Sequence, residues 1–236
     1  MRIIGHLVIK DEADRYLERV LRWHSDVCDE LFVYDDGSTD DSVAVASQYA
    51  TVVSAGSSQF MSHEGACRQA AWDSMAAVMR PSAGSDWILC LDADEFTVSK
   101  SETKREGLER LADGAGTANS VDLRIDEIFD VVAGVPMRRL DGFWGGIHAP
   151  RFVRFLEGGR FTHKEMGGGS IPAYGTPGLD ATGDTLGILH YGYATVADRV
   201  AKHGRYSSKT NNGHNRAHVA SILTAPTLRS VKGVAP

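Results

Sequence analysis

The sequence contains few cysteines and no long apolar segment. Only three cysteines, Cys28, Cys67 and Cys90, occur in 236 residues, and their spacing does not fit a metal site. We therefore expect free thiols in a reducing, cytoplasmic location. No apolar run approaches the length needed to cross a bilayer, and the N-terminus lacks the hydrophobic segment of a signal peptide. Neither a transmembrane segment nor a leader is expected.

Acidic residues are absent from the last part of the chain. After Asp198 there is no Asp or Glu, whereas seven Lys or Arg residues occur there. The remainder holds 18 basic and 31 acidic residues, within a net charge of −6 for the whole chain. This asymmetry predicts that the basic tail meets something anionic, a solvated end being the alternative. The acidic body, without a stacking motif, argues against a nucleic-acid partner.

Strand-like and helix-like segments alternate through the first 92 residues. Strands are expected over 2–9, 30–34, 51–56 and 86–91. Helices are expected over 13–24, from 38–41 to about 49, and over 63–80. This order predicts an α/β protein with a Rossmann-like, mostly parallel central sheet flanked by helices. A further helix is expected over 100–111 and further strands over 121–129 and 149–156.

Two acidic clusters follow strands of this predicted sheet. Asp35 and Asp36 end the second strand, and "LDADEF" places Asp92, Asp94 and Glu95 after the fourth. The carboxyl ends of parallel strands meet at one edge, where ligands bind in such folds. Crowded carboxylates repel one another, and Mg²⁺ or Mn²⁺, which prefer oxygen ligands, would hold them together. An acidic loop that solvates a helix start is the alternative, because a bare D-x-D occurs often by chance.

Several motifs together resemble a known family. "VYDDGSTDDS" and "LDADEF", with "APRFVRF" and "ILHYGYATVADRVAKHGRY" more loosely, resemble the nucleotide-sugar-dependent glycosyltransferases of the GT-A fold, specifically the family-two group. The resemblance implies metal-dependent transfer of a sugar from a UDP- or GDP-sugar to a hydroxyl of a glycan, protein or small-molecule acceptor. It also implies a GT-A domain over 1–198, made of a nucleotide-binding half (1–96) and an acceptor-side extension (97–198). A basic segment over 199–236 would pack on or near the donor site.

The resemblance assigns the metal and nucleotide contacts. It implies that Asp92, Asp94 and His190 bind the metal, and imidazole favours Mn²⁺ over Mg²⁺. It also implies a set of nucleotide contacts. The acids after the second strand are Asp35 and Asp36, the main-chain groups after the first strand are those of Ile9 and Lys10, and the arginine of the third helix is Arg68. Asp92 and two late cations, Lys202 and Arg205, complete the set.

Some of these residues have a plainer interpretation. Arg68 can pair with Glu64 four residues earlier on a helix surface. Glu12 fits a helix N-terminus, where an acid is favoured by the helix dipole, better than a ligand contact. Arg199 lies at helical spacing from Lys202 and fits a solvated basic face.

The catalytic base is the least defined part of the resemblance. It falls on His163 and Glu165 in "FTHKEMGGG", where the intervening Lys164 departs from the usual pattern. Further candidates are two residues of "LDGFWGGIH", Asp141 and His148, while Phe143 and Trp144 could stack on a sugar or anchor a loop. A nucleotidyltransferase is an alternative, although "KDEADRY" stands where it would carry a glycine-rich phosphate loop. A non-catalytic carbohydrate- or nucleotide-sugar-binding protein is another.

Overall fold

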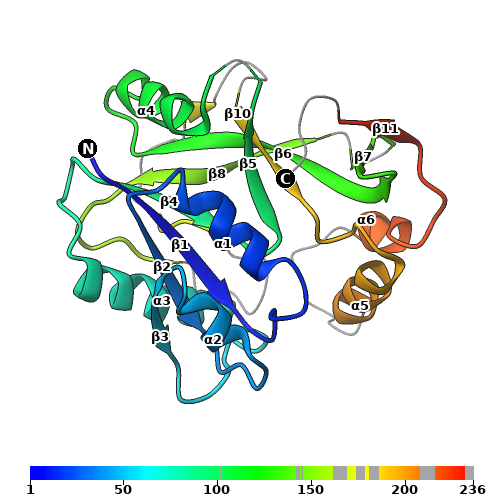
Figure 1. Ribbon diagram of the computed structural model, residues 1–236, viewed down its shortest axis with the longest axis horizontal. Coiled ribbons are helices and arrows are strands. Elements are labelled where there is room, and N and C mark those ends of the chain that lie inside the picture. Colours follow the sequence, from blue (N-terminus) through cyan, green and yellow to red (C-terminus); the bar gives the residue numbers. More distant parts are fainter. Residues whose placement is uncertain are drawn as a thin grey trace.

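Four parallel strands form the first half of the sheet. The computed structural model describes residues 1–100, 102–141, 144, 146–161, 169–173, 179–180, 186–207 and 216–231 (Figure 1). The chain alternates between β1 (Ile3–Ile9), α1 (Leu17–Ser25), β2 (Glu30–Asp35), α2 (Ser42–Ala46), β3 (Thr51–Ser54), α3 (Glu64–Met79) and β4 (Trp87–Leu91). β1 pairs in parallel with both β2 and β4, and β2 pairs in parallel with β3. The predicted fold class is confirmed.

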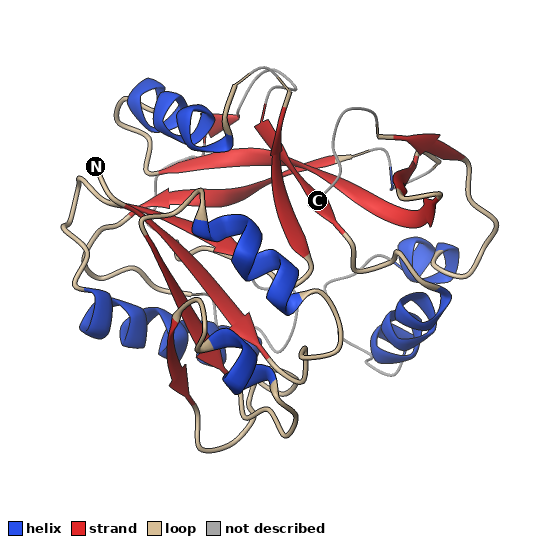
Figure 2. Ribbon diagram, in the orientation of Figure 1, coloured by secondary structure: helices blue, strands red, loops and turns tan. Residues whose placement is uncertain are grey.

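The second half adds strands of both directions to the same sheet (Figure 2). Its elements are β5 (Glu95–Ser99), α4 (Lys104–Gly114), β6 (Ser120–Val132), β7 (Val135–Arg139), β8 (Ile147–Arg154), β9 (Leu179–Asp180), β10 (Leu186–His190), α5 (Val196–Ser207), α6 (Arg216–Ser221) and β11 (Leu228–Ser230). β8 lies between β4 and β6 and is antiparallel to both. β10 pairs in parallel with β6 and antiparallel with β5. β6, β10 and α5 of this second half contribute residues to the site described below.

Helices cover both faces of the parallel strands, with α1 and α2 in front and α3 behind in Figure 1. Side chains alternate between the two faces along a strand. Ile3 and Leu7 of β1 pack with Leu21 of α1, whereas Ile4 packs with Met75 of α3. Burial on both faces explains why these strands are almost continuously apolar. It also leaves the strand ends as the place for polar ligands.

Several element boundaries differ from the sequence prediction. α1 begins at Leu17 rather than near residue 13, because Asp11 has a left-handed φ of 51° and the chain turns there. β5 begins directly at Glu95, where no strand was expected. β6 continues to Val132 and forms a hairpin with β7 through Ala133 and Gly134, both at positive φ. Such two-residue turns usually carry Asn-Gly or Asp-Gly, so Ala133-Gly134 is only a weak sequence signal for a hairpin.

Three other expectations concern the chain as a whole. Within the described ranges, no helix is both long and apolar enough to span a membrane. All three cysteines are buried free thiols. The predicted division after residue 198 falls inside α5, which runs from Val196 to Ser207.

Candidate functional site

Polar residues gather where β1, β2 and β4 end. β1 lies between β2 and β4, and the chain builds outward from β1 first through β2 and β3 and then through β4. Such a reversal of strand order opens a crevice at the carboxyl ends of the strands. Lys10, Asp35 and Asp92 each follow one of these three strands or end it. The two acidic clusters therefore share one edge of the sheet, as predicted.

Asp94 is surrounded by residues from distant parts of the chain. Its Oδ1 lies 3.3 Å from His190 Nε2, and its Oδ2 lies 3.9 Å from Lys202 Nζ. The same Nζ lies 3.2 Å from His190 Nε2, and Glu127 Oε2 lies 2.6 Å from Nδ1 on the other side of the ring. A main-chain hydrogen bond also links the two segments, because the Tyr191 N–H donates to the Asp94 carbonyl at 2.8 Å. The structure thus brings the late histidine and the D-x-D segment together.

The charges in this cluster shift one another's pKa values. Burial alone would raise the pKa of Asp94, but His190 and Lys202 hold it well below its usual range. Burial alone would lower the pKa of His190, but the carboxylates of Glu127 and Asp94 raise it well above its usual value. Perturbed and mutually dependent groups of this kind are typical of functional sites, although structural ion pairs also produce them.

Gly192 forms part of the wall of this cluster. A Cβ atom at this position would lie 2.5 Å from His190 Nε2 and 2.9 Å from Asp94 Oδ2, and it would overlap Lys202 Nζ. Real Cβ contacts are not this short, so a side chain here would enter the space between the charged groups. Glycine therefore lets Lys202 Nζ lie close to His190 and Asp94.

The donor atoms suit a divalent cation that is shared with a ligand. Within the described part of the chain, no three His, Cys, Asp or Glu side chains converge on one point. Asp94 and His190 alone present an oxygen and a nitrogen 3.3 Å apart. Neighbouring ligands of an octahedral ion with bonds near 2.1 Å are about 3 Å apart, and Mg²⁺ usually completes its shell with water and substrate phosphates. Two protein ligands are therefore compatible with a metal that is bound together with a diphosphate.

The other two acids of "DADE" have cationic partners of their own. Glu95 is fully buried, and Arg151 of β8 grips it with two hydrogen bonds of 2.9 and 3.1 Å. Glu95 also accepts the N–H of Asp92 at 3.1 Å, which shapes the turn. Sequence reasoning missed Arg151, because nothing near it in the chain indicates a buried partner. Glu95 is thus part of the framework, whereas the side chain of Asp92 is 38% exposed at the site.

Arg68 links α3 to the acidic segment. Its Nε donates to Glu64 at 2.9 Å, which is the plain helix pair that the spacing allows. Its other nitrogen lies 3.5 Å from Asp92, and its guanidinium stacks over Phe60 at 5.1 Å. The side chain is 9% exposed, so this positive charge is held at the site rather than in solvent. The pair with Glu64 is thus present but buried rather than at the surface, and the nucleotide contact stays a prediction.

Asp35 and Asp36 have different surroundings. The Asp36 carboxylate accepts from the Ser58 hydroxyl and from the N–H groups of Gln59 and Phe60, at 2.6, 2.8 and 3.0 Å. It therefore fixes the loop after β3. Asp35 accepts the Ser38 N–H at 2.9 Å. Of the two, Asp35 has more remaining acceptor capacity for a base.

The segment after β1 is tied to the loop after β2. The N–H groups of Asp11, Glu12 and Ala13 donate to side chains of Ser38, Ser42 and Asp40. Ile9 accepts the Asp36 N–H at 2.8 Å, and Lys10 Nζ donates to the Gly37 carbonyl at 3.1 Å. These hydrogen bonds hold the segment after β1 against the loop after β2 at the edge of the sheet.

Glu12 is not a helix N-terminal acid, because α1 begins five residues later. Arg15 binds both of its carboxylate oxygens at 2.9 Å and also binds Asp198 of α5 at 2.8 Å. Burial raises the pKa of Glu12 to about 7, with Arg15 opposing this shift and the charge of Asp94 adding to it. Glu12 therefore belongs to the surroundings of the site, contrary to its plainer interpretation.

Two positively charged side chains of α5 point toward the rest of the protein. Lys202 reaches Asp94, and Arg199 donates to the carbonyls of Phe129 and Tyr193, so Arg199 anchors the helix rather than facing solvent. Arg205, the other predicted diphosphate contact, is exposed.

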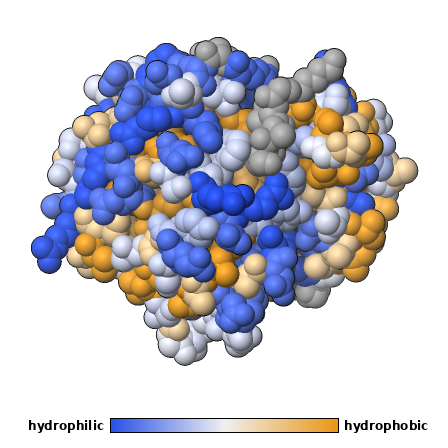
Figure 3. All heavy atoms as spheres, in the orientation of Figure 1, coloured by the Kyte–Doolittle hydropathy of each residue, from blue (hydrophilic) through white to orange (hydrophobic). Residues whose placement is uncertain are grey.

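Hydrophobic surface lies along the right-hand side of the molecule in Figure 3, where Figure 1 places α5, α6 and β7. The exposed residues of α5 include two valines, Val196 and Val200.

The acceptor-side candidates have mixed outcomes. His163, Glu165 and Phe143 lie outside the described residues. Asp141 is bound by Arg139 through two nitrogens and accepts the Thr227 N–H, so hydrogen bonding from Arg139 holds its pKa well below the usual range. A carboxylate held this way is a poor base. His148 is exposed, and Trp144 is buried with its Nε1 donating to Ser221, which favours anchoring over sugar stacking.

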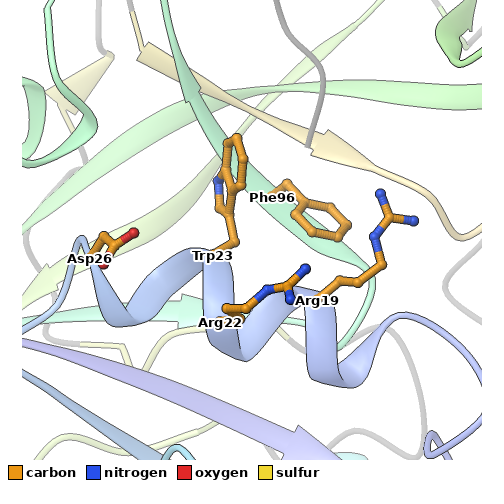
Figure 4. Close-up of a pocket in the computed structure, with 5 residues that line it drawn as sticks. All are labelled: Arg19, Arg22, Trp23, Asp26 and Phe96. Carbon is orange, nitrogen blue, oxygen red and sulfur yellow. The ribbon is translucent and has the colours of Figure 1, made fainter.

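A separate pocket of about 290 Å³ lies between α1 and β5 (Figure 4). None of the predicted site residues lines it. Its walls are two aromatic and three charged side chains: Trp23, Phe96, Arg19, Arg22 and Asp26. The Arg19 guanidinium lies over the Phe96 ring at 5.7 Å, so this charge already has a partner within the chain.

No protein-family model matches the sequence, and no curated protein matches it. Among solved structures, a mycobacterial protein is 27% identical over 53% of this chain and 41% of its own, with a TM-score of 0.37. Glucosyl-3-phosphoglycerate synthase from Mycobacterium tuberculosis, in complex with Mn²⁺ and UDP-glucose, is 22% identical over 53% and 43%, with a TM-score of 0.32. A 4-diphosphocytidyl-2C-methyl-D-erythritol synthase is 16% identical over 65% and 75%, with a TM-score of 0.39.

The matched solved structures thus include a synthase in complex with Mn²⁺ and UDP-glucose. They also include a nucleotidyltransferase. The chain spans less than half the length of the first structures it matches. At these TM-scores the likeness carries no inference about what this chain does.

Proposed function

We propose that this protein is a glycosyltransferase that moves a sugar from a UDP- or GDP-sugar to an acceptor hydroxyl, with Mn²⁺ or Mg²⁺ as cofactor. The observation that carries the proposal is the convergence of Asp94, His190 and Lys202 around Gly192. Two side chains of metal-binding type and a largely buried cation meet at the edge of an α/β sheet. A diphosphate with a divalent ion suits these residues, because the metal ion would be held by Asp94 and His190 and the negative diphosphate by Lys202.

Each residue then has a chemical task. Asp94 and His190 would hold the metal, with Asp92 beside them, and the metal would supply positive charge to the diphosphate. Lys202 is a preplaced cation for the phosphate oxygen on which charge develops as the sugar departs. Arg68 supplies a second fixed positive charge next to Asp92. The exposed Arg205 stays a proposed further contact.

The acceptor and nucleotide contacts extend this proposal. Asp35 would accept an N–H from the base edge, with main-chain groups of Ile9 and Lys10 lining the same pocket. His163 and Glu165 stay the proposed bases for the acceptor hydroxyl, which must lose a proton during transfer. The acceptor is a glycan, a protein or a small molecule.

A nucleotidyltransferase is less well supported. Such an enzyme needs main-chain N–H groups free to cradle phosphates after the first strand. Here the N–H groups of Asp11, Glu12 and Ala13 donate to side chains of the neighbouring loop. Release of pyrophosphate from a nucleoside triphosphate would restore this alternative.

The test uses ligand-induced stabilisation of a variant that changes no charge. Gly192→Ala adds one methyl group to the space between Asp94, His190 and Lys202. At 100 times the Kd, a ligand stabilises the folded state by about 2.7 kcal/mol. For a chain of this size that corresponds to a rise in Tm of roughly 5–10 °C. We expect this rise for the wild type with UDP and Mn²⁺, and its loss in Gly192→Ala.

Gly204→Ala in α5 is the matched control, because a Cβ there meets no atom within 4 Å. It should bind like the wild type. Slow release of free sugar from a UDP- or GDP-sugar without acceptor should follow the same order, and Asp94→Ala should abolish it. An equal thermal shift in excess chelator, or in Gly192→Ala, would contradict the proposal.

A further inference from the structure

His190 is held between two acidic elements by the register of its strand. β10 pairs in parallel with β6, which places His190 opposite Glu127. On its other side β10 pairs antiparallel with β5, which places His190 opposite Glu95. The Glu95 carboxylate is occupied by Arg151, so Glu127 is the strand partner whose carboxylate reaches the imidazole. The pairing of β10 with β6 thus places the Glu127 carboxylate beside the His190 ring.

The two ring nitrogens have distinct partners. Nδ1 lies 2.6 Å from Glu127 Oε2, a short distance typical of a charge-assisted hydrogen bond. Nε2 lies 3.3 Å from Asp94 Oδ1 and 3.2 Å from Lys202 Nζ. An ionised carboxylate only accepts, so Nδ1 carries the proton that Glu127 binds. Nε2 thereby faces Asp94, Lys202 and Gly192.

We infer that Glu127 is a positioning residue that fixes the His190 ring, so that Nε2 faces Asp94 and the site. This inference rests on the proposed function for its consequence, the binding of a metal, but its geometry is independent of it. A histidine that binds a metal usually donates its other N–H to a carboxylate or carbonyl, and removing that partner typically weakens metal binding 10- to 100-fold. Tyr193 adds an edge contact to the ring, at 5.8 Å between centroids.

The alternative is that Glu127 only joins β6 to β10. A purely structural contact would change stability but would leave the ring nitrogens and the metal affinity unaltered. Glu127→Ala removes the acceptor, whereas Glu127→Gln keeps a carbonyl oxygen that can accept the same proton. Asp130→Asn on the same strand removes one negative charge at an exposed position and is the matched control.

The first measurement is ¹⁵N-detected NMR of the histidine rings in the metal-free protein, with His190→Gln to assign the signals. We expect a downfield, slowly exchanging Nδ1 proton for His190 in the wild type and in Asp130→Asn. It should be weakened in Glu127→Gln and lost in Glu127→Ala. An unchanged His190 signal in a folded Glu127→Ala would overturn the inference, whatever the protein binds.

The second measurement is Mn²⁺ affinity in the presence of UDP, from the EPR signal of free Mn²⁺. Glu127→Ala should bind 10- to 100-fold more weakly than the wild type, Glu127→Gln should fall between them, and Asp130→Asn should match the wild type. Equal affinity in Glu127→Ala overturns the inference while the proposed function stands. If the wild type itself binds no Mn²⁺ with UDP, the proposed function fails, and the NMR signal alone decides the role of Glu127.

Discussion

The buried pair of Glu95 and Arg151 offers a sharp test of how the acidic segment is held. The Glu95 side chain is fully buried, and Arg151 is 11% exposed and binds it through two nitrogens. Arg151→Met would leave the carboxylate in place, with the Asp92 N–H as its one remaining donor among the described residues. Breaking a buried ion pair by removing one partner costs about 3–5 kcal/mol, because the remaining charge stays buried without compensation.

The assay is urea unfolding monitored by circular dichroism, with the free energy of unfolding extrapolated to water. For a chain of this length, a loss of about 3–5 kcal/mol lowers Tm by roughly 6–20 °C. The double variant Glu95→Gln with Arg151→Met removes both charges and should recover most of the loss. Arg110→Met is the control, since its pair with Glu102 is half exposed and such pairs contribute about 0–1 kcal/mol.

A loss below 1 kcal/mol in Arg151→Met would refute the reasoning, and so would a double variant no more stable than the single one. Either result would mean that the loss does not come from an uncompensated buried charge on Glu95. The distinction matters for the site, because it separates the framework acid Glu95 from Asp92 and Asp94, the proposed metal ligands.

Three further predictions concern the rest of the framework. Burial lowers the pKa of His6 and of His24 to about 4, below the unfolded value of 6.5, so the unfolded chain takes up protons first as pH falls. The free energy of unfolding should therefore decrease between pH 6.5 and 4, by up to about 3 kcal/mol for each histidine, and His6→Leu should flatten the urea-derived profile; an unchanged slope would contradict this. Asp36→Asn should destabilise the protein by about 1–3 kcal/mol and speed amide exchange at Gln59 and Phe60, whose N–H groups it binds; unchanged exchange would exclude this role. Thr103→Ala removes the capping box of α4 and should cost about 1 kcal/mol, with a Thr103→Ser variant close to the wild type in the same denaturation assay.

The start of α1 shows where local patterns mislead. Ala13 and Tyr16 fit the helical spacing, but the side chains of Ser38, Asp40 and Ser42 take the N–H groups of residues 11–13. These partners come from the loop after β2 and cannot be seen in a local window. β5 was missed for a related reason, because its pairing partner β10 is supplied from far along the chain.

The sequence by itself determined the alternation of strands and helices and the position of acids at strand ends. Both depend on neighbours in the chain, namely apolar periodicity and the turn that follows each strand. The tertiary structure alone decided which acid meets which cation. Asp92, Asp94 and Glu95 are near neighbours in the sequence, but they meet Arg68, His190 with Lys202, and Arg151 respectively. Those partners come from strand register and from the packing of α3 and α5, which no local pattern encodes.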